Sequence, residues 1–158
     1  PQPPKPQPKR RKNLAIKSLT QTTSWRIESD ADIDECANVS SVFHNRLKDP
    51  ASFPKLESDV TTFYISQNLK DVIGYQDGVA LENQNGEVKK YMELYSTYYR
   101  SGLPVGPICN PGLKAINAAL HPAETNYVFF LTDESGEHFY YASTIAEHNA
   151  NGVKAGLF

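Results

Sequence analysis

Helical hydrophobic periodicity dominates the first part of this chain, and a hairpin pattern appears only near its end. Apolar residues recur at helical spacing weakly over residues 13–28 and clearly over residues 32–47. The apolar run 127–131 and the aromatic run 138–141 flank a polar, glycine-containing turn, as in a β-hairpin. Strands and helices do not alternate as they do in parallel βαβ folds. The pattern therefore predicts an α+β fold with N-terminal helices, a small antiparallel sheet built on the late hairpin, and a C-terminal helix.

The remaining segments give weaker signals. Residues 58–65 favour an extended segment or a short buried turn of helix, and residues 71–86 favour loops and short strands. Asn110 is placed to cap a helix that runs to Leu120. Thr144 and Glu147 have capping-box spacing, which predicts a last helix that Asn151 and Gly152 would end.

The first residues differ in composition from the rest. Residues 1–8 contain five of the eleven prolines, and residues 1–12 contain five cations and no acid. Such a segment has nothing apolar to bury, so we expect a disordered basic linker over 1–12 and one folded domain over 13–158. The domain is acidic, because it holds all 18 aspartates and glutamates and only part of the 16 lysines and arginines. An acidic domain argues against nucleic acid as a partner.

Cysteine content and hydropathy only partly restrict the cellular compartment in which the protein works. Cys36 and Cys109 match no metal or redox spacing, and whether they form a disulfide stays open. No apolar run is long enough to span a membrane, and the first residues lack the apolar segment of a signal peptide. We expect any membrane anchor to lie outside this chain.

Several separated motifs carry a family resemblance. Residues 42–47 read VFHNRL, residues 56–61 read LESDVT, residues 95–98 read YSTY and residues 102–108 read GLPVGPI. Further motifs follow in order: NPG at 110–112, AINAALHP at 115–122, GEHF at 136–139 and EHN at 147–149. Together they span roughly residues 14–150, and they resemble the catalytic domain of the MltG (YceG-like) lytic transglycosylases in the same order.

The resemblance implies a catalytic glutamate on the helix before VFHNRL, and the alignment places Glu28 at that position. Ordinary glycosidases divide the work between two carboxylates, whereas a lytic transglycosylase uses one. Glu28 would protonate the leaving glycosidic oxygen and then accept the proton of the C6 hydroxyl of N-acetylmuramic acid, which closes a 1,6-anhydro ring. A raised pKa would keep Glu28 protonated, and partial burial beside Trp25 or Phe43 would raise it. Spacing alone also fits a solvated acid at a helix end.

Other polar residues in the motifs are candidates for substrate binding, each with a structural alternative. Arg46 and Asn45 offer donors for sugar hydroxyls, acetamido groups or the lactyl carboxylate, but Arg46 also suits a structural clamp. Tyrosines suit stacking on sugar faces or packing in the core. Small polar residues suit substrate contact or a hydrogen-bonded turn. The full set of candidates is Asn45, Arg46, Ser58, Asp59, Thr61, Tyr95, Thr97, Tyr98, His138 and His148.

The two histidines do not have the spacing of a zinc site, and no cofactor is expected. His138 and His148 would instead line the cleft or bind backbone carbonyls beside it. No nucleophilic serine elbow or phosphate-binding glycine loop is present in the sequence.

The resemblance implies endolytic cleavage of the β-1,4 bond between N-acetylmuramic acid and N-acetylglucosamine in peptidoglycan. It also implies action at the extracytoplasmic face of the bacterial cytoplasmic membrane, beside cell-wall synthases. Two alternatives stay open. One is a hydrolytic muramidase in which Asp59 or another acid activates water, and the other is a glycan-binding module without activity.

Overall fold

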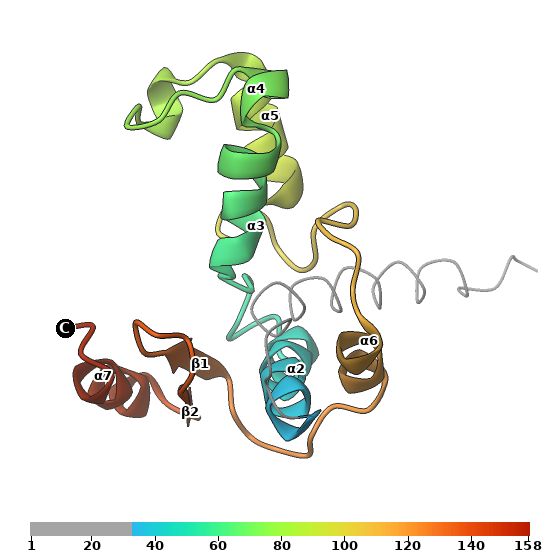
Figure 1. Ribbon diagram of the computed structural model, residues 1–158, viewed down its shortest axis with the longest axis vertical. Helices are drawn as coiled ribbons and strands as arrows, with labels where there is room; N and C mark the ends of the chain where they lie inside the picture. Colours follow the sequence, from blue (N-terminus) through green and yellow to red (C-terminus); the bar gives the residue numbers. More distant parts are fainter. Residues whose placement is uncertain (1–32) are drawn as a thin grey trace, which may run out of the picture.

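The computed structural model describes residues 33–158, so the expected linker over 1–12, the helix over 13–28 and Glu28 lie outside the described residues. The elements follow in the order α2 (Ile33–Lys48), α3 (Asp59–Phe63), the π-helix η1 (Tyr64–Asn68), α4 (Lys70–Ile73), the 3-10 helix η2 (Leu81–Asn83), α5 (Gly86–Tyr95), α6 (Leu113–Leu120), β1 (Phe129–Thr132), β2 (Phe139–Ala142) and α7 (Ile145–Lys154). Helices with one two-stranded antiparallel sheet confirm the predicted α+β class (Figure 1).

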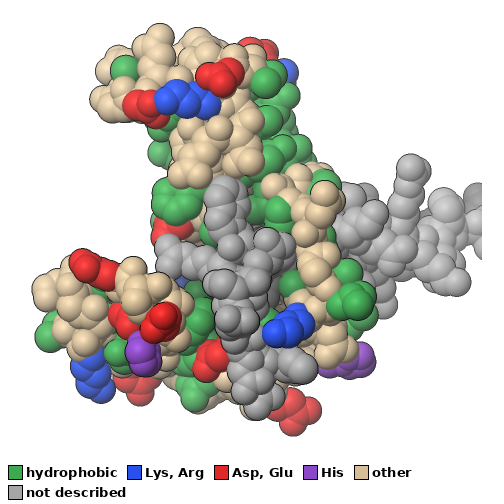
Figure 2. All heavy atoms as spheres, in the orientation of Figure 1, with side chains coloured by type: hydrophobic (Ala, Val, Ile, Leu, Met, Phe, Trp, Pro, Cys, Tyr) green, Lys and Arg blue, Asp and Glu red, His purple; other side chains and the backbone are tan. Residues whose placement is uncertain are grey.

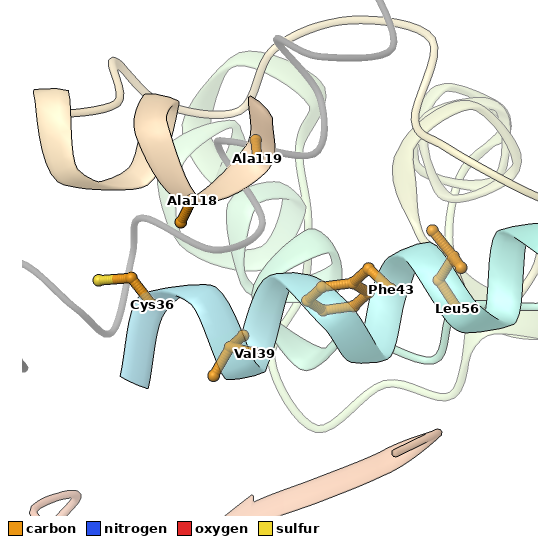
Figure 3. Close-up of a cluster of buried hydrophobic side chains, with 6 residues drawn as sticks. All are labelled: Cys36, Val39, Phe43, Leu56, Ala118 and Ala119. Atoms are coloured by element: carbon orange, nitrogen blue, oxygen red, sulfur yellow. The ribbon is translucent and has the colours of Figure 1, made fainter. Parts of the chain in front are cut away.

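Helix α2 is the centre of a body formed with α6, the hairpin and α7. Its apolar positions Cys36, Val39 and Phe43 recur every three to four residues and belong to one buried cluster with Ala118 and Ala119 of α6 (Figure 3). Alanines at this contact let the two helices approach closely. Phe130 of β1 packs edge to face on Phe43, with ring centroids 5.9 Å apart, and ties the hairpin to the same core. The predicted helix 32–47 is thereby confirmed to within a residue.

Residues 59–95 form a separate helical arm that extends from the body (Figure 1). The arm has its own small core of Ile65, Ile73, Val88 and Met92. The helical alternative for 58–65 is correct, but the short strands predicted within 71–86 are wrong. Asn85 caps α5, because its side chain accepts a hydrogen bond from the Val88 N–H at 3.0 Å.

The hairpin and α7 follow the prediction closely, but two helix ends do not. Strands β1 and β2 pair antiparallel from Phe129 opposite Ala142 to Thr132 opposite Phe139. Thr144 and Glu147 form the expected capping box. Helix α7 passes through Asn151 and Gly152 to Lys154, so the predicted stop is wrong.

Helix α6 begins after Gly112, so Asn110 is not its cap. Pro111 follows Asn110 directly, and α6 starts only once the chain has passed both Pro111 and Gly112. Within residues 33–158, no helix combines the length and the apolar character needed to cross a membrane.

Candidate functional site

A groove of about 800 Å³ lies between the base of the arm and the body. Its floor is formed by Val39, Val42 and Phe43 of α2 together with β1. One wall is the segment 57–60 with Tyr98, and the opposite wall is formed by the hairpin turn, α7 and the last residues of the chain. The notch between the arm and the unit of β1, β2 and α7 is visible in Figure 2. An apolar floor with polar groups along the walls is compatible with a ligand-binding cleft.

Arg46 lines the bottom of the groove and is only 5 % exposed. Its Nε donates to the Val128 carbonyl at 2.6 Å, and its Nη1 donates to the Glu57 carboxylate at 3.0 Å and to the carbonyls of Lys55 and Leu56 at 3.2 and 3.3 Å. The guanidinium also lies 5.0 Å from the centroid of the Phe129 ring. These contacts join α2, β1 and the segment before α3, so they favour the structural alternative for Arg46.

Asp59 and Tyr98 lie together at the wall on the arm side. The Tyr98 hydroxyl donates to Asp59 Oδ1 at 2.6 Å. Burial and this hydrogen bond to a carboxylate raise the pKa of Tyr98, which keeps the phenol protonated. Both side chains remain accessible from the groove, and Tyr98 is 40 % exposed. The pair thus offers a ligand an aromatic ring and a carboxylate at one place.

The candidate threonines lie behind this wall rather than in it. Thr61 and Thr97 are both fully buried, and their Oγ1 atoms are 3.0 Å apart. The Thr97 N–H donates to Thr61 Oγ1 at 3.0 Å, and the Ser58 N–H donates to Thr97 Oγ1 at 2.9 Å. Ser58 lines the groove, but the recorded hydrogen bonds use its backbone. Thr61 and Thr97 therefore hold the wall together without reaching the groove.

His148 lines the body side of the groove. Its ring stacks on Phe129 with centroids 5.1 Å apart. Burial, together with the nearby positive charge of Arg46, lowers the pKa of His148. Its Nδ1 is buried and has no hydrogen-bond partner among the described residues. At neutral pH the groove therefore presents an uncharged imidazole.

The other candidates lie outside the groove. The Asn45 Nδ2 donates to the carbonyls of Thr125 and Tyr127, both at 2.9 Å, beside a separate polar depression. Tyr95 packs in the arm against Tyr64, with ring centroids 5.3 Å apart. His138 is exposed on the hairpin turn, where its Nδ1 lies 2.8 Å from Asp133 Oδ2.

Asp133 itself lines the groove, although the motifs did not single it out. A hydrogen bond from the Ser135 hydroxyl, aided by His138, lowers the pKa of Asp133 to about 2. Phe129 and Glu57 also line the groove, but the sequence patterns did not identify them as candidates. Glu57 stands inside the LESDVT motif, which was an available signal, whereas nothing in the apolar run 127–131 distinguishes Phe129.

An α+β domain with an open groove of mixed polar and apolar lining, between a helical arm and a hairpin, fits the class of small ligand-binding or catalytic domains. The model of the YceG-like family matches residues 17–154. The chain belongs to the YceG-like family.

The matched relatives agree with this assignment. The chain is 36 % identical over 141 residues to an endolytic murein transglycosylase of Bacillus subtilis, covering 89 % of this chain and 35 % of that protein. It is 26 % identical over 140 residues to an endolytic murein transglycosylase of Streptococcus pneumoniae, covering 89 % of this chain and 24 % of the relative. The chain thus spans about a third or less of the length of these relatives.

A crystal structure of a yceG-like protein from Listeria monocytogenes superposes with a TM-score of 0.57 at 27 % identity. The superposition covers 87 % of this chain and 38 % of that protein. The fold described above is therefore shared with a member of the same family.

Proposed function

We propose that this chain carries the catalytic domain of an endolytic lytic transglycosylase that cleaves the β-1,4 bond between N-acetylmuramic acid and N-acetylglucosamine in peptidoglycan. The observation that carries the proposal is the family match over most of the chain, together with the activity named for the relatives in Bacillus subtilis and Streptococcus pneumoniae. The groove supports it, because an apolar cleft with exposed polar groups suits sugar rings with polar edges.

In the proposed mechanism, Glu28 is both general acid and general base. Its carboxylic acid gives a proton to the glycosidic oxygen as the bond to C1 of N-acetylmuramic acid breaks and an oxocarbenium-like centre forms. The resulting carboxylate then accepts the proton of the C6 hydroxyl while O6 bonds to C1. No water is consumed, so the product ends in a 1,6-anhydro ring. Because the nucleophile belongs to the substrate, holding the strand in the correct pose supplies its effective concentration.

The polar candidates divide into two groups under this proposal. Asp59, Tyr98 and His148, together with Ser58, contact the glycan directly, since they line the groove. Arg46 also borders the groove, but its burial and its bonds to the protein favour a structural role, and the buried Thr61 and Thr97 act behind the groove surface.

The proposal extends to the setting of the whole protein. A substrate in the cell wall requires action outside the cytoplasmic membrane, and the murein in the relatives' names supports that compartment. We further propose that the full-length protein is anchored at the extracytoplasmic face of this membrane and works beside cell-wall synthases, as the family resemblance implies.

Digestion of purified peptidoglycan tests the reaction. We expect the parent chain to release fragments with 1,6-anhydromuramic ends, read by mass spectrometry. Glu28→Gln should lower the rate by at least about a thousandfold, because the amide can neither donate nor accept the required proton. Asp30→Asn is a matched control, because it removes a nearby acid without touching the proposed catalytic group.

The masses of the products separate the alternatives. Fragments heavier by one water, with reducing ends, would show a hydrolase and contradict the proposed mechanism. Binding of glycan without any cleavage would instead identify a binding module. Equal loss of activity in Glu28→Gln and Asp30→Asn would contradict the special role of Glu28.

A further inference from the structure

Tyr98 differs from the other aromatic side chains of the groove. Phe43 packs on Phe130, and Phe129 packs on both Phe53 and His148, so these rings are occupied by neighbouring rings. Within residues 33–158, Tyr98 has no aromatic ring and no cation stacked on it, and it is 40 % exposed at the groove wall. Phe139 is likewise stacked on a neighbouring ring, that of Tyr141, and Phe158, although 76 % exposed, lies with its ring against Gly152. Tyr98 is therefore an exposed aromatic side chain of the groove wall that can receive a ligand against its ring.

The orientation of the Tyr98 ring is held from its hydroxyl end. The hydroxyl donates to Asp59 Oδ1 at 2.6 Å, and Asp59 is the first residue of α3. This bond uses the only proton of the phenol. While this bond is made, the hydroxyl end of the side chain stays at the groove wall and the ring can turn only about its own long axis. A ligand therefore meets a ring whose position is already set, which lowers the entropy cost of binding.

The backbone that carries both residues is held by the buried threonines. Thr61 lies two residues after Asp59, and Thr97 directly precedes Tyr98. Their hydroxyls meet at 3.0 Å, and the Thr97 hydroxyl also accepts from the N–H of Ser58. Two segments more than thirty residues apart in sequence are thus joined directly behind the Asp59–Tyr98 pair.

Glu57 adds a second restraint at the same place. It has a φ of 53°, in the left-handed region that a non-glycine residue adopts at some cost. The Glu57 N–H donates to the Thr97 carbonyl at 3.3 Å, and its carboxylate pairs with Arg46. These contacts hold the chain in this conformation just before Ser58 and Asp59 enter the wall.

We infer that the Tyr98 ring is the platform on which a pyranose ring of the glycan strand stacks, and that Asp59 accepts a hydrogen bond from a hydroxyl of that sugar. Thr61 and Thr97 are positioning residues, which act through Tyr98 and Asp59. The inference rests on the proposed function for the identity of the ligand. The physical basis is that sugar C–H groups carry partial positive charge and pack on the negative face of an aromatic ring, while a carboxylate is a strong acceptor for hydroxyl donors.

The test measures binding of a soluble tetrasaccharide of alternating N-acetylglucosamine and N-acetylmuramic acid. It uses the full chain carrying Glu28→Gln, so that the probe stays intact. We expect upfield shifts of sugar ring protons in NMR titrations, because these protons would lie over the Tyr98 ring. Tyr98→Leu should remove these shifts and weaken binding about tenfold, as expected for the loss of one stacked ring. Tyr98→Phe should keep the shifts, because it keeps the ring.

Two further sets of variants test whether weaker binding is specific to the Tyr98 ring and to its positioning. Tyr99→Leu removes the neighbouring exposed tyrosine, which does not line the groove, and should bind as the parent does. Thr97→Val should weaken binding although Tyr98 is intact, and Thr97→Ser should restore it because the hydroxyl returns. Near-ultraviolet circular dichroism checks that each variant is folded.

The outcomes are distinct from those of the cleavage test. Binding that depends on Tyr98, in a chain whose parent cuts no peptidoglycan, supports the platform and rejects the proposed reaction. Cleavage with anhydro ends, together with equal binding by the parent and Tyr98→Leu, rejects the platform and keeps the reaction. Absence of upfield-shifted sugar protons in the parent titration, or absence of binding, overturns the inference.

Discussion

At the scale of single residues, Arg46 is a motif residue whose contacts hold the groove together. Its guanidinium contacts three backbone carbonyls and one carboxylate, and it lies against the rings of Phe53 and Phe129. Because the arginine is buried, removing it leaves the carbonyl of the buried Leu56 without this donor in a place that water reaches poorly, whereas the Glu57 side chain is half exposed. The floor and one wall of the groove depend on this one side chain.

We expect Arg46→Met to lower the free energy of unfolding by about 3 kcal/mol, since it leaves buried acceptors unpaired and the Glu57 carboxylate without its partner. Urea unfolding followed by circular dichroism measures the change. Lys48→Met, which removes an exposed cation on the same helix, should shift the stability by less than about 0.5 kcal/mol. Equal effects of the two substitutions would show that Arg46 contributes only a surface charge.

His148 gives a pH dependence at the same scale. Its pKa is lowered from an ordinary value of 6.5, chiefly by burial. The unfolded chain therefore binds a proton more readily than the folded chain, and stability falls as the pH drops through 6.5 toward the lowered pKa. His44, whose pKa is also lowered chiefly by burial, acts in the same direction.

We expect the thermal unfolding midpoint of the parent chain to fall between about pH 7.5 and about pH 5. The fall should be smaller in His148→Gln, which cannot take up the proton. His121→Gln, at an exposed histidine, should keep the pH dependence of the parent. A steeper dependence in His148→Gln would contradict the assigned direction of the pKa shift.

At the scale of elements, α7 combines a start fixed by a capping box with an end that depends on the few residues that follow it. The Thr144–Glu147 capping box defines its first turn. At the other end, Gly156 has a φ of 75° and the Leu157 N–H donates to the Gly152 carbonyl at 3.0 Å, as in a Schellman motif. The last residue, Phe158, folds back so that its ring occupies the space beside Gly152 that a Cβ would fill, with ring atoms as near as 2.0 Å to that position.

We therefore expect the effect of Gly152→Ala to depend on Phe158. In the parent, the gain in helix propensity should be offset because the methyl group displaces the ring. In a Phe158→Ala background, Gly152→Ala should stabilise α7 by about 0.5–1 kcal/mol. A double-mutant cycle by thermal unfolding measures the coupling. Additive effects would show that the ring does not rest on Gly152.

At the scale of the whole molecule, the arm and the body have separate cores. The buried cluster of the body joins α2, α6 and the segment before α3, whereas the cluster of the arm contains only residues of the arm. The buried hydroxyls of Thr61 and Thr97 join the two ends of the arm where the groove is formed, and Arg46 of the body bonds the Glu57 carboxylate beside them. Small cooperative units with few buried apolar residues open more easily than the rest of a protein.

We expect Ile65→Ala, which removes a fully buried side chain of the arm, to raise hydrogen exchange of the α5 amides while the α2 amides keep their protection. Phe43→Ala, at a buried position of the body, is the converse variant and should raise exchange in α2. Mass spectrometry of peptides resolves the two regions. Parallel loss of protection in both regions after Ile65→Ala would show one cooperative unit.

The sequence by itself determined the features that depend on near neighbours along the chain. The apolar stripe of α2, the turn of the hairpin and the capping box of α7 each arise within a few residues, so periodicity and capping chemistry predicted them. The family was also identified from the order of short motifs, and the match over residues 17–154 agrees with it. Glu28 as the catalytic acid stays a prediction of the sequence.

The tertiary structure decided which motif residues reach the groove. Asp59 and Tyr98 are hydrogen-bonded although they are 39 residues apart in the sequence, and Arg46 and Val128 are 82 residues apart. No local pattern encodes either contact. Burial separated Thr61 and Thr97 from the groove, although they stand in the same motifs as the residues that line it. The strands predicted within 71–86 failed for a related reason, because a shared core with η1 and α5 favoured short helices over the local turn signals. Contacts between distant segments are chosen by packing and hydrogen bonding in three dimensions, and a single sequence does not record them.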